Sequence, residues 1–223
     1  MRPARPVGSE TLYGPRQSRF ARYLERREER RPDPVARELR RRVLAGLRGE
    51  VLELGCGDGR AFELYGSGVD RLLAVEPDAV AREMAAGRGR DAAIPIEVVD
   101  GDATALPAAD ATFDAAVVVW VLCSVPDPAA ALRELRRVLK RGGELRFYEH
   151  VRSPHALFRG LQRAADRLFW TRALGGCKTT RNTAAGIAAA GFELVELERG
   201  FHSSSLLTIT SAPYVLGTAR SPL

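Results

Sequence analysis

Cysteine is scarce in this sequence and widely spaced. Only Cys56, Cys123 and Cys177 occur among 223 residues. These cysteines are too few and too scattered along the sequence for a disulfide framework or a zinc site. We therefore expect a protein of a reducing cytoplasm that holds no metal ion.

Long hydrophobic runs are also missing. The N-terminus has no apolar stretch of the signal-peptide kind, and the longest apolar run, residues 115–123, is far shorter than the roughly 20 residues of a membrane span. We expect no transmembrane segment and a cytoplasmic location. The composition, 45% hydrophobic and 28% charged, is typical of a globular protein, and the length suits one α/β domain.

Lysine is almost absent, because Lys140 and Lys178 are the only two and the other cations are arginines. Residues 1–50 hold fourteen arginines against seven acids, so the net charge of +6 belongs to this segment. Such a segment could meet nucleic acid or an anionic membrane surface. Arginines and glutamates alternate over residues 22–31, however, which favours a solvated helix. We expect no nucleic-acid partner and leave peripheral membrane contact open.

One glycine-rich stretch, Val51–Arg60, organises the rest of the chain. An apolar run with β character breaks into alternating glycines and resumes as a helical pattern over residues 61–65, which predicts strand, tight turn and helix. The glycines let the backbone approach a ligand, and the helix offers free N–H groups. A nucleotide-like cofactor should lie across this turn, which comprises Gly55, Cys56, Gly57, Asp58 and Gly59.

The spacing of the turn argues against a dinucleotide. Arg60 stands where the dinucleotide fingerprint needs a third small residue. Glu53 instead precedes Gly55 by two residues, so the pattern is acid-x-Gly-x-Gly-x-Gly. This pattern resembles motif I of the class I S-adenosylmethionine (SAM) methyltransferases. A carboxylate suits the ammonium and sulfonium of SAM and would repel a pyrophosphate.

Two more acids follow the next two predicted strands. Glu76 comes twenty-one positions after Gly55, where a carboxylate can accept hydrogen bonds from ribose hydroxyls, and Pro77 follows it. Asp102 could bond the adenine amino group while the backbone at Ala103 reads the ring. Glu76 could also be a surface acid, and Asp102 a helix cap. With Glu53, these acids end consecutive strands, where open α/β sheets bind ligands.

Strands and helices alternate along the body of the chain, which predicts a parallel sheet with right-handed crossovers. A loose basic arm (1–19) and N-terminal cap helices (20–48) should precede the methyltransferase domain (49–223). The chain closes with one helix followed by two strands, which suggests a β-hairpin at the edge of an otherwise parallel sheet. We expect strands at 51–54, 72–75, 96–99, 115–121, 144–148, 192–198 and 206–216, and helices at 20–31, 35–47, 78–86, 128–139, 157–170 and 183–190, with Gly142-Gly143 as the turn that opens the fifth strand.

The later motifs resemble one branch of this family, the alkyl thiol methyltransferases of the methyltransferase-like group with their bacterial relatives. The resemblance spans about residues 20–220 and implies a Rossmann-like α/β sheet of order 3-2-1-4-5-7-6 with strand 7 antiparallel. It also implies SAM as cofactor, S-adenosylhomocysteine as product and a small-molecule thiol as acceptor. The animal enzymes begin with an apolar anchor and this chain does not, so membrane location is not carried over. The motifs are Val121–Val125, Arg133–Leu139, Gly142-Gly143, Glu149-His150-Val151 and Gly176–Arg181.

The acceptor side of the site is predicted less directly. Val119 and Trp120 end the fourth strand and should face the methyl group, although Trp120 could equally be a core aromatic. A thiol is mostly protonated at neutral pH, so a nearby base would help, and His150 is our first choice; a satisfied strand-end histidine is the alternative. The substrate pocket should include Tyr23, Cys123, Cys177 as a wall, and Arg181, which could hold an anionic acceptor or pair with an acid.

Other functions stay open at this point. Quinone and phospholipid methyltransferases share much of the motif set. A nucleic-acid methyltransferase is disfavoured, because residues 123–126 read Cys-Ser-Val-Pro where an Asn or Asp-Pro-Pro-aromatic motif would be expected. A SAM-binding protein without turnover would keep the same glycines and acids. The sequence does not predict an oligomeric state.

Overall fold

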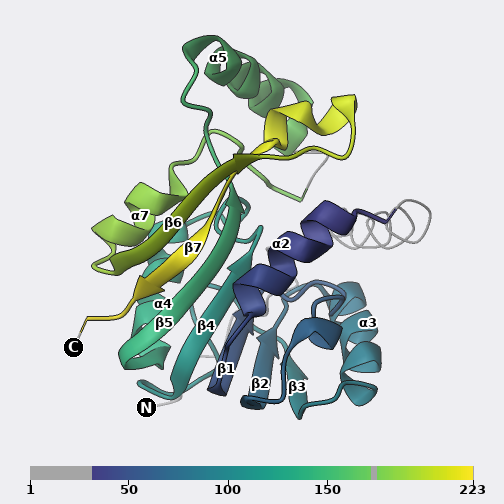
Figure 1. Ribbon diagram of the computed structural model, residues 1–223, viewed down its shortest axis with the longest axis vertical. Coiled ribbons are helices and arrows are strands. Elements are labelled where there is room, and N and C mark those ends of the chain that lie inside the picture. Colours follow the sequence, from purple (N-terminus) through teal and green to yellow (C-terminus); the bar gives the residue numbers. More distant parts are fainter. Residues whose placement is uncertain (1–31, 172–174, 223) are drawn as a thin grey trace, which may run out of the picture.

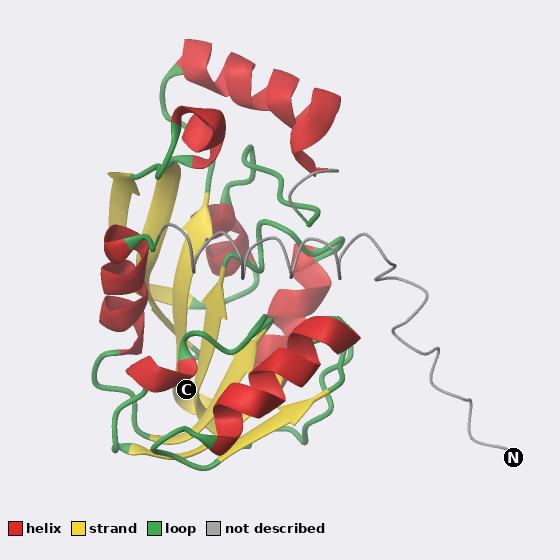
Figure 2. Ribbon diagram, turned by 90° about the vertical axis from the view of Figure 1, so that its right-hand side faces the viewer, coloured by secondary structure: helices red, strands yellow, loops and turns green. Residues whose placement is uncertain are grey.

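The computed structural model describes residues 32–171 and 175–222. These residues form a seven-stranded sheet of order β3-β2-β1-β4-β5-β7-β6, with helices on both faces (Figures 1 and 2). Strand β7 is antiparallel to both neighbours and the other pairs are parallel, which confirms the predicted order and hairpin edge. The strands are β1 (Gly49–Leu54), β2 (Val69–Val75), β3 (Ile96–Val99), β4 (Phe113–Val119), β5 (Leu139–His150), β6 (Glu193–Phe201) and β7 (Pro213–Arg220).

Aspartates begin three of the helices. Asp33, Asp78 and Asp127 each accept a hydrogen bond from a backbone N–H three residues on, which satisfies an N–H that the helix itself leaves unpaired. Proline follows the cap in the first and third cases, where its fixed φ suits a first helical turn. The helices are α2 (Pro34–Leu44), α3 (Ala79–Arg90), α4 (Pro128–Val138), α5 (Ala156–Ala165) and α7 (Thr183–Ala189), with short segments η2 (Phe62–Leu64), η3 (Asp166–Trp170, π-helical) and η4 (Leu206–Ser211).

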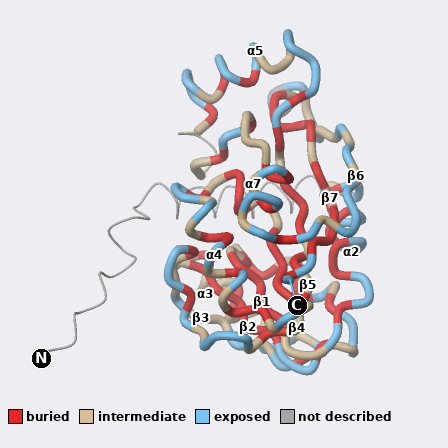
Figure 3. Tube along the Cα trace, turned by 90° about the vertical axis from the view of Figure 1, so that its left-hand side faces the viewer, coloured by how far each residue is buried: buried red, intermediate tan, exposed pale blue. Residues whose placement is uncertain are grey.

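The sheet divides the core into two layers because side chains alternate along each strand. Val51 of β1 faces a cluster that includes residues of α2 and α3, whereas Leu52 faces a cluster with α4 and α7. The central strands β1 and β4 are accordingly mostly buried, whereas the edge strand β6 and the outer sides of the helices are mostly exposed (Figure 3). This arrangement leaves the carboxyl ends of β1, β2, β4 and β5 as the edge where loops can build a site.

Three local predictions were wrong. The glycine turn is followed by a single 3-10 turn, η2, and not by a helix, since Gly66 and Gly68 follow at once. Gly142-Gly143 lies inside β5, where both glycines bond Ser221 of the chain end. Residues 206–211 form η4, not a strand, because hydroxyls such as those of Ser203 and Ser211 bond nearby carbonyls in competition with a ladder.

The expected helix at 20–31 and the arm at 1–19 lie outside the described residues. Among the helices of 32–171 and 175–222, none has the length and apolar character needed to cross a membrane.

Candidate active site

The turn after β1 is shaped to receive a ligand. Gly55, Gly57 and Gly59 have φ of +70°, +58° and +77°, a region that side chains disfavour. A Cβ at Gly55 would come 2.6 Å from Val121, and one at Gly59 would come 2.7 Å from the Phe62 ring. A Cβ at Gly57 would meet no atom within 4 Å. Two glycines therefore allow close packing, and the middle one faces open space.

Glu76 joins the end of β2 to this turn. Its buried carboxylate accepts a hydrogen bond from the Gly57 N–H at 2.9 Å and another from the Asp78 N–H at 2.9 Å. Burial raises the pKa of Glu76, and the two N–H donors oppose that rise. Each carboxylate oxygen can accept more than one hydrogen bond, so both can also receive ligand hydroxyls.

Glu53 is a buried acid on the same edge. The Tyr65 hydroxyl donates to it at 3.1 Å, and burial raises the pKa of Glu53 to about 7. A cation placed beside this carboxylate would favour its charged form. The ammonium and sulfonium of SAM supply such a charge, so the residues present fit SAM at this turn.

The other residues of the turn have protein partners. Asp58 pairs with Arg60 and Arg88, each at 2.8 Å, and the Cys56 thiol is buried with its pKa raised. Asp102 accepts from the backbone N–H of Thr104 at 2.7 Å, so it begins a turn and does not cap a helix. Pro77 is half-buried, and its carbonyl accepts from Arg82. Ala103 is buried beneath the turn that Asp102 begins.

Trp120 directly follows β4, beside half-buried Val119 at the end of that strand, in a left-handed conformation with φ +60°. Its backbone N–H donates to Tyr148, and its indole is stacked on the His150 imidazole with 5.0 Å between centroids. The Arg40 guanidinium of α2 lies 4.4 Å from the centroid of the indole. Helix α2 thus reaches over the end of β4, where half-buried Trp120 packs against the edge of the core.

Glu149 was missed as a functional residue in the sequence. It is fully buried at the end of β5 and accepts three hydrogen bonds at 2.9 Å, from the N–H groups of Val121, Leu122 and Cys123. Burial raises the pKa of Glu149, and the three donors oppose that rise. The signal was present: Glu149 shares a strand face with the core residues Leu145 and Phe147. Its role is to hold the loop that follows β4.

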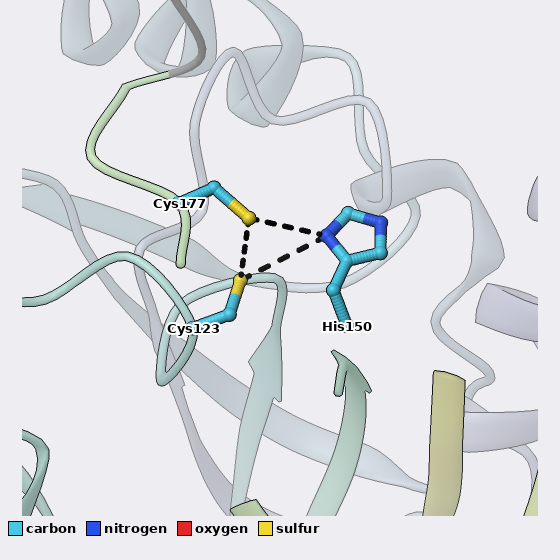
Figure 4. Close-up of side chains that lie close together, drawn as sticks. All are labelled: Cys123, His150 and Cys177. Atoms are coloured by element: carbon cyan, nitrogen blue, oxygen red, sulfur yellow. Dashed lines mark hydrogen bonds between the residues drawn. The ribbon is translucent and has the colours of Figure 1, made fainter. Parts of the chain in front are cut away.

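Cys123, Cys177 and His150 converge beside this loop (Figure 4). The two sulfur atoms lie 3.6 Å apart, and the Nδ1 atom of His150 lies 3.6 Å from the Cys177 sulfur and 3.9 Å from the Cys123 sulfur. The expectation that the cysteines are scattered was therefore wrong for two of the three, because the fold joins residues 54 positions apart. The shared hydrogen bond lowers the pKa of Cys177 and raises that of Cys123.

Arg181, predicted to hold an anionic acceptor or to pair with an acid, bonds two backbone carbonyls. Its guanidinium donates to the backbone carbonyls of Leu122 and Val125, the latter at 2.6 Å, and so clamps the loop that carries Cys123. Tyr23 lies outside the described residues.

Comparisons with known proteins agree with this geometry. Residues 52–147 match a family model described as a methyltransferase domain. Human thiol S-methyltransferase TMT1B is 31% identical over 202 residues, which cover 86% of this chain and 81% of that protein. The N-methyltransferase NodS from Bradyrhizobium japonicum, solved in complex with S-adenosylhomocysteine, has a TM-score of 0.68 at 21% identity and covers 92% of this chain and 99% of its own.

The chain belongs to the class I SAM-dependent methyltransferases. Within that class it is similar to the thiol S-methyltransferases over most of its length. Its similarity to the demethylmenaquinone methyltransferase of Mycolicibacterium vanbaalenii is higher in identity, 39%, but is confined to 110 residues, 49% of this chain and 45% of that enzyme.

Proposed function

We propose that this protein is a SAM-dependent thiol S-methyltransferase that acts on a small molecule. The observation that carries the proposal is the extent of the similarity to thiol S-methyltransferases. A match over 86% of the chain must reach beyond residues 52–147, into the segments that vary with the acceptor on a common cofactor scaffold.

The residues around the glycine turn are proposed to hold the cofactor. Glu76 receives the ribose hydroxyls, Glu53 offsets the positive charge of the amino-acid end, and Asp102 with Ala103 faces the adenine. When bound, SAM supplies a methyl group that leaves its sulfonium sulfur, and that sulfur keeps the electron pair of the broken bond. Cofactor residues in this proposal are Glu53, Gly55, Cys56, Gly57, Asp58, Gly59, Glu76, Pro77, Asp102, Ala103, Val119 and Trp120.

The acceptor is proposed to lie beyond the ends of β4 and β5. Strand β4 is the direct neighbour of β1, so the loop after β4 lies beside the glycine turn, and a Cβ at Gly55 would come 2.6 Å from Val121 of that loop. Trp120 and Arg40 cover this edge and help exclude water, while the loop held by Glu149 and Arg181 aligns the acceptor. His150, at the end of β5, is proposed to lie beside the acceptor thiol and to promote the loss of its proton.

The test is the formation of S-adenosylhomocysteine and a methyl thioether by the purified protein, measured by mass spectrometry with a panel of alkyl and aryl thiols. We expect turnover that rises with the thiolate fraction of the acceptor. Similarity to demethylmenaquinone methyltransferases favours a reduced quinone as the second candidate. Methylation of a demethylmenaquinol with no thiol methylated would contradict our proposal, and SAM binding with no turnover on any acceptor would indicate a binding protein.

A further inference from the structure

The group formed by Cys123, Cys177 and His150 has the geometry of a metal site. Tetrahedral zinc has metal–sulfur bonds of about 2.3 Å and metal–nitrogen bonds of about 2.0 Å, which place two sulfur ligands about 3.8 Å apart and a sulfur and a nitrogen about 3.5 Å apart. The corresponding separations here are 3.6 Å between the sulfurs and 3.6 and 3.9 Å from sulfur to Nδ1. All three atoms point toward one centre (Figure 4).

The chain holds these ligands in place through its backbone. The Cys123 N–H donates to Glu149, and the Cys123 carbonyl accepts from the Lys178 N–H at 2.8 Å, so the two cysteine-bearing loops are joined directly. Gly176, with φ +90°, allows the second loop to approach the first, since a Cβ there would lie 3.0 Å from the Ser124 carbonyl oxygen. Rigid support of this kind is what a metal site requires of the residues behind its ligands.

A second clamp fixes the loop that carries Cys177. Asp166 accepts hydrogen bonds from the backbone N–H and hydroxyl of both Thr179 and Thr180. The two cysteines are buried, with exposed fractions of 0% and 5%, and His150 is half-buried. The Cys123 and Cys177 thiols lie 3.6 Å apart and neither is in a disulfide. Soft and borderline metal ions favour such a pair of sulfur donors.

We propose that Cys123, Cys177 and His150 bind one Zn²⁺ ion through Sγ, Sγ and Nδ1 and leave its fourth coordination position to the acceptor thiol. Two cysteines, one histidine and an open position form the pattern of a catalytic zinc site, whereas structural zinc has four protein ligands. Two thiolates and a neutral imidazole also match the charge of the ion. The earlier expectation of no metal is replaced by this proposal.

The role of the fourth position rests on the proposed thiol methylation. The acceptor sulfur forms a bond to zinc and displaces a bound water, its S–H bond breaks, and the proton passes to solvent. A coordinated thiol is deprotonated at neutral pH, so the nucleophile forms without a protein base. His150 then acts as a ligand and not as the proton acceptor. A neutral thioether is a weak ligand, so the methylated product leaves the ion.

The first test measures metal and not activity. Protein purified without chelators should contain about one zinc per chain by elemental analysis, and Cys123→Ser, Cys177→Ser and His150→Ala should each lose most of it. Cys56→Ser is the matched control, because Cys56 is also buried but lies in the glycine turn, and its zinc content should equal that of the wild type. Zinc that stays in the three ligand variants would overturn the proposal.

Cobalt gives a readout on the unaltered chain. Wild-type protein stripped with a chelator and reloaded with Co²⁺ should show thiolate-to-cobalt charge-transfer absorption and the intense visible bands of a tetrahedral ion. A small acceptor thiol should change those bands by entering the fourth position. Failure of the reduced protein to take up either Zn²⁺ or Co²⁺ would overturn the proposal. The proposal would also fail if Cys123 and Cys177 formed a disulfide with each other in the presence of either ion and bound no metal.

A third measurement separates this proposal from the proposed function. Stripping zinc should lower thiol methylation at least tenfold, zinc should restore it, and SAM affinity measured by calorimetry should not change. Equal methylation with and without the ion would overturn the role of the fourth position. A protein that binds zinc but methylates no thiol would contradict the proposed function. The metal assignment would still be supported in that case by the cobalt spectrum.

Discussion

The indole of Trp120 lies stacked on the imidazole of His150, with 5.0 Å between ring centroids and 14° between ring planes. The two residues mark the ends of adjacent strands, β4 and β5, and neither is near the other in sequence. The stack fixes the imidazole that points Nδ1 at the two cysteines. Trp120 is therefore expected to orient His150 as well as to cover the cofactor edge.

Replacing Trp120 tests this orientation. Trp120→Ala should lower thiol turnover roughly fivefold, since loss of an aromatic pair of this kind is worth about 1 kcal/mol. Trp120→Phe keeps a stacking surface and should recover most of the rate. The effect should appear in kcat and in the Co²⁺ spectrum, with little change in folding measured by circular dichroism. Equal rates for Trp120→Ala and the wild type would show that the stack has no role.

Gly57 offers a direct test of the cofactor turn. Gly57→Arg should lower SAM affinity more than 100-fold, because the new side chain would enter the open space that we assign to the cofactor. The change should be read by calorimetry against the wild type.

Gly46 provides the matched control for that variant. It too has a positive φ, +74°, and open space around its Cβ position, but it precedes β1 whereas Gly57 follows it. Gly46→Arg should carry the same backbone strain, about 1–2 kcal/mol, and leave SAM affinity unchanged. If both variants lost SAM equally, strain and not blockage would explain the loss.

The raised pKa of Glu53 predicts a pH dependence of stability. The carboxyl has a pKa of about 7 in the folded protein against 4.5 as a reference, so the folded state binds its proton more tightly than the unfolded chain. The resulting stabilisation is complete below pH 4.5 and is lost as the pH rises through 7, by an amount on the order of 3 kcal/mol. Glu53→Gln should remove this loss in the cofactor-free protein, measured by urea unfolding between pH 5 and 8.

SAM binding should show the opposite trend. A cationic ligand favours the ionised carboxylate, so the wild-type affinity should be about tenfold lower at pH 6 than at pH 7.5. Glu53→Gln should flatten this profile, whereas Glu63→Gln, a change on the exposed side of η2, should keep it. An unchanged slope in Glu53→Gln would remove Glu53 from the cofactor site.

Glu149 should contribute mainly to stability. Glu149→Gln leaves one oxygen to serve three N–H groups, so we expect a loss of about 2–4 kcal/mol in the free energy of unfolding. Thermal unfolding measures this loss. Glu196→Gln, on an exposed position of β6, should cost less than about 0.5 kcal/mol. A similarly small cost at Glu149 would contradict the role we give it.

Local chemistry determined much of what the sequence predicted correctly. The turn after β1, the helices α2, α3 and α4, and the positions of Glu53, Glu76 and Asp102 at or just beyond the ends of β1, β2 and β3 depend on residues within a few positions of one another. The sheet order followed from resemblance to a family. The same local reasoning misjudged the segment 206–211, where hydroxyl groups favour a 3-10 helix over a strand.

Only the tertiary structure decided what lies beside the turn. Nothing in the spacing of Cys123 and Cys177 indicates that their sulfurs meet, because the contact arises from the docking of two loops through Lys178, Gly176 and Arg181. Glu149 can likewise accept hydrogen bonds from three N–H groups only because β4 pairs with β5, which brings the loop after β4 to its carboxylate. Sequence specifies short-range hydrogen bonds and backbone freedom, whereas contacts between distant side chains exist only once strands are paired and packed.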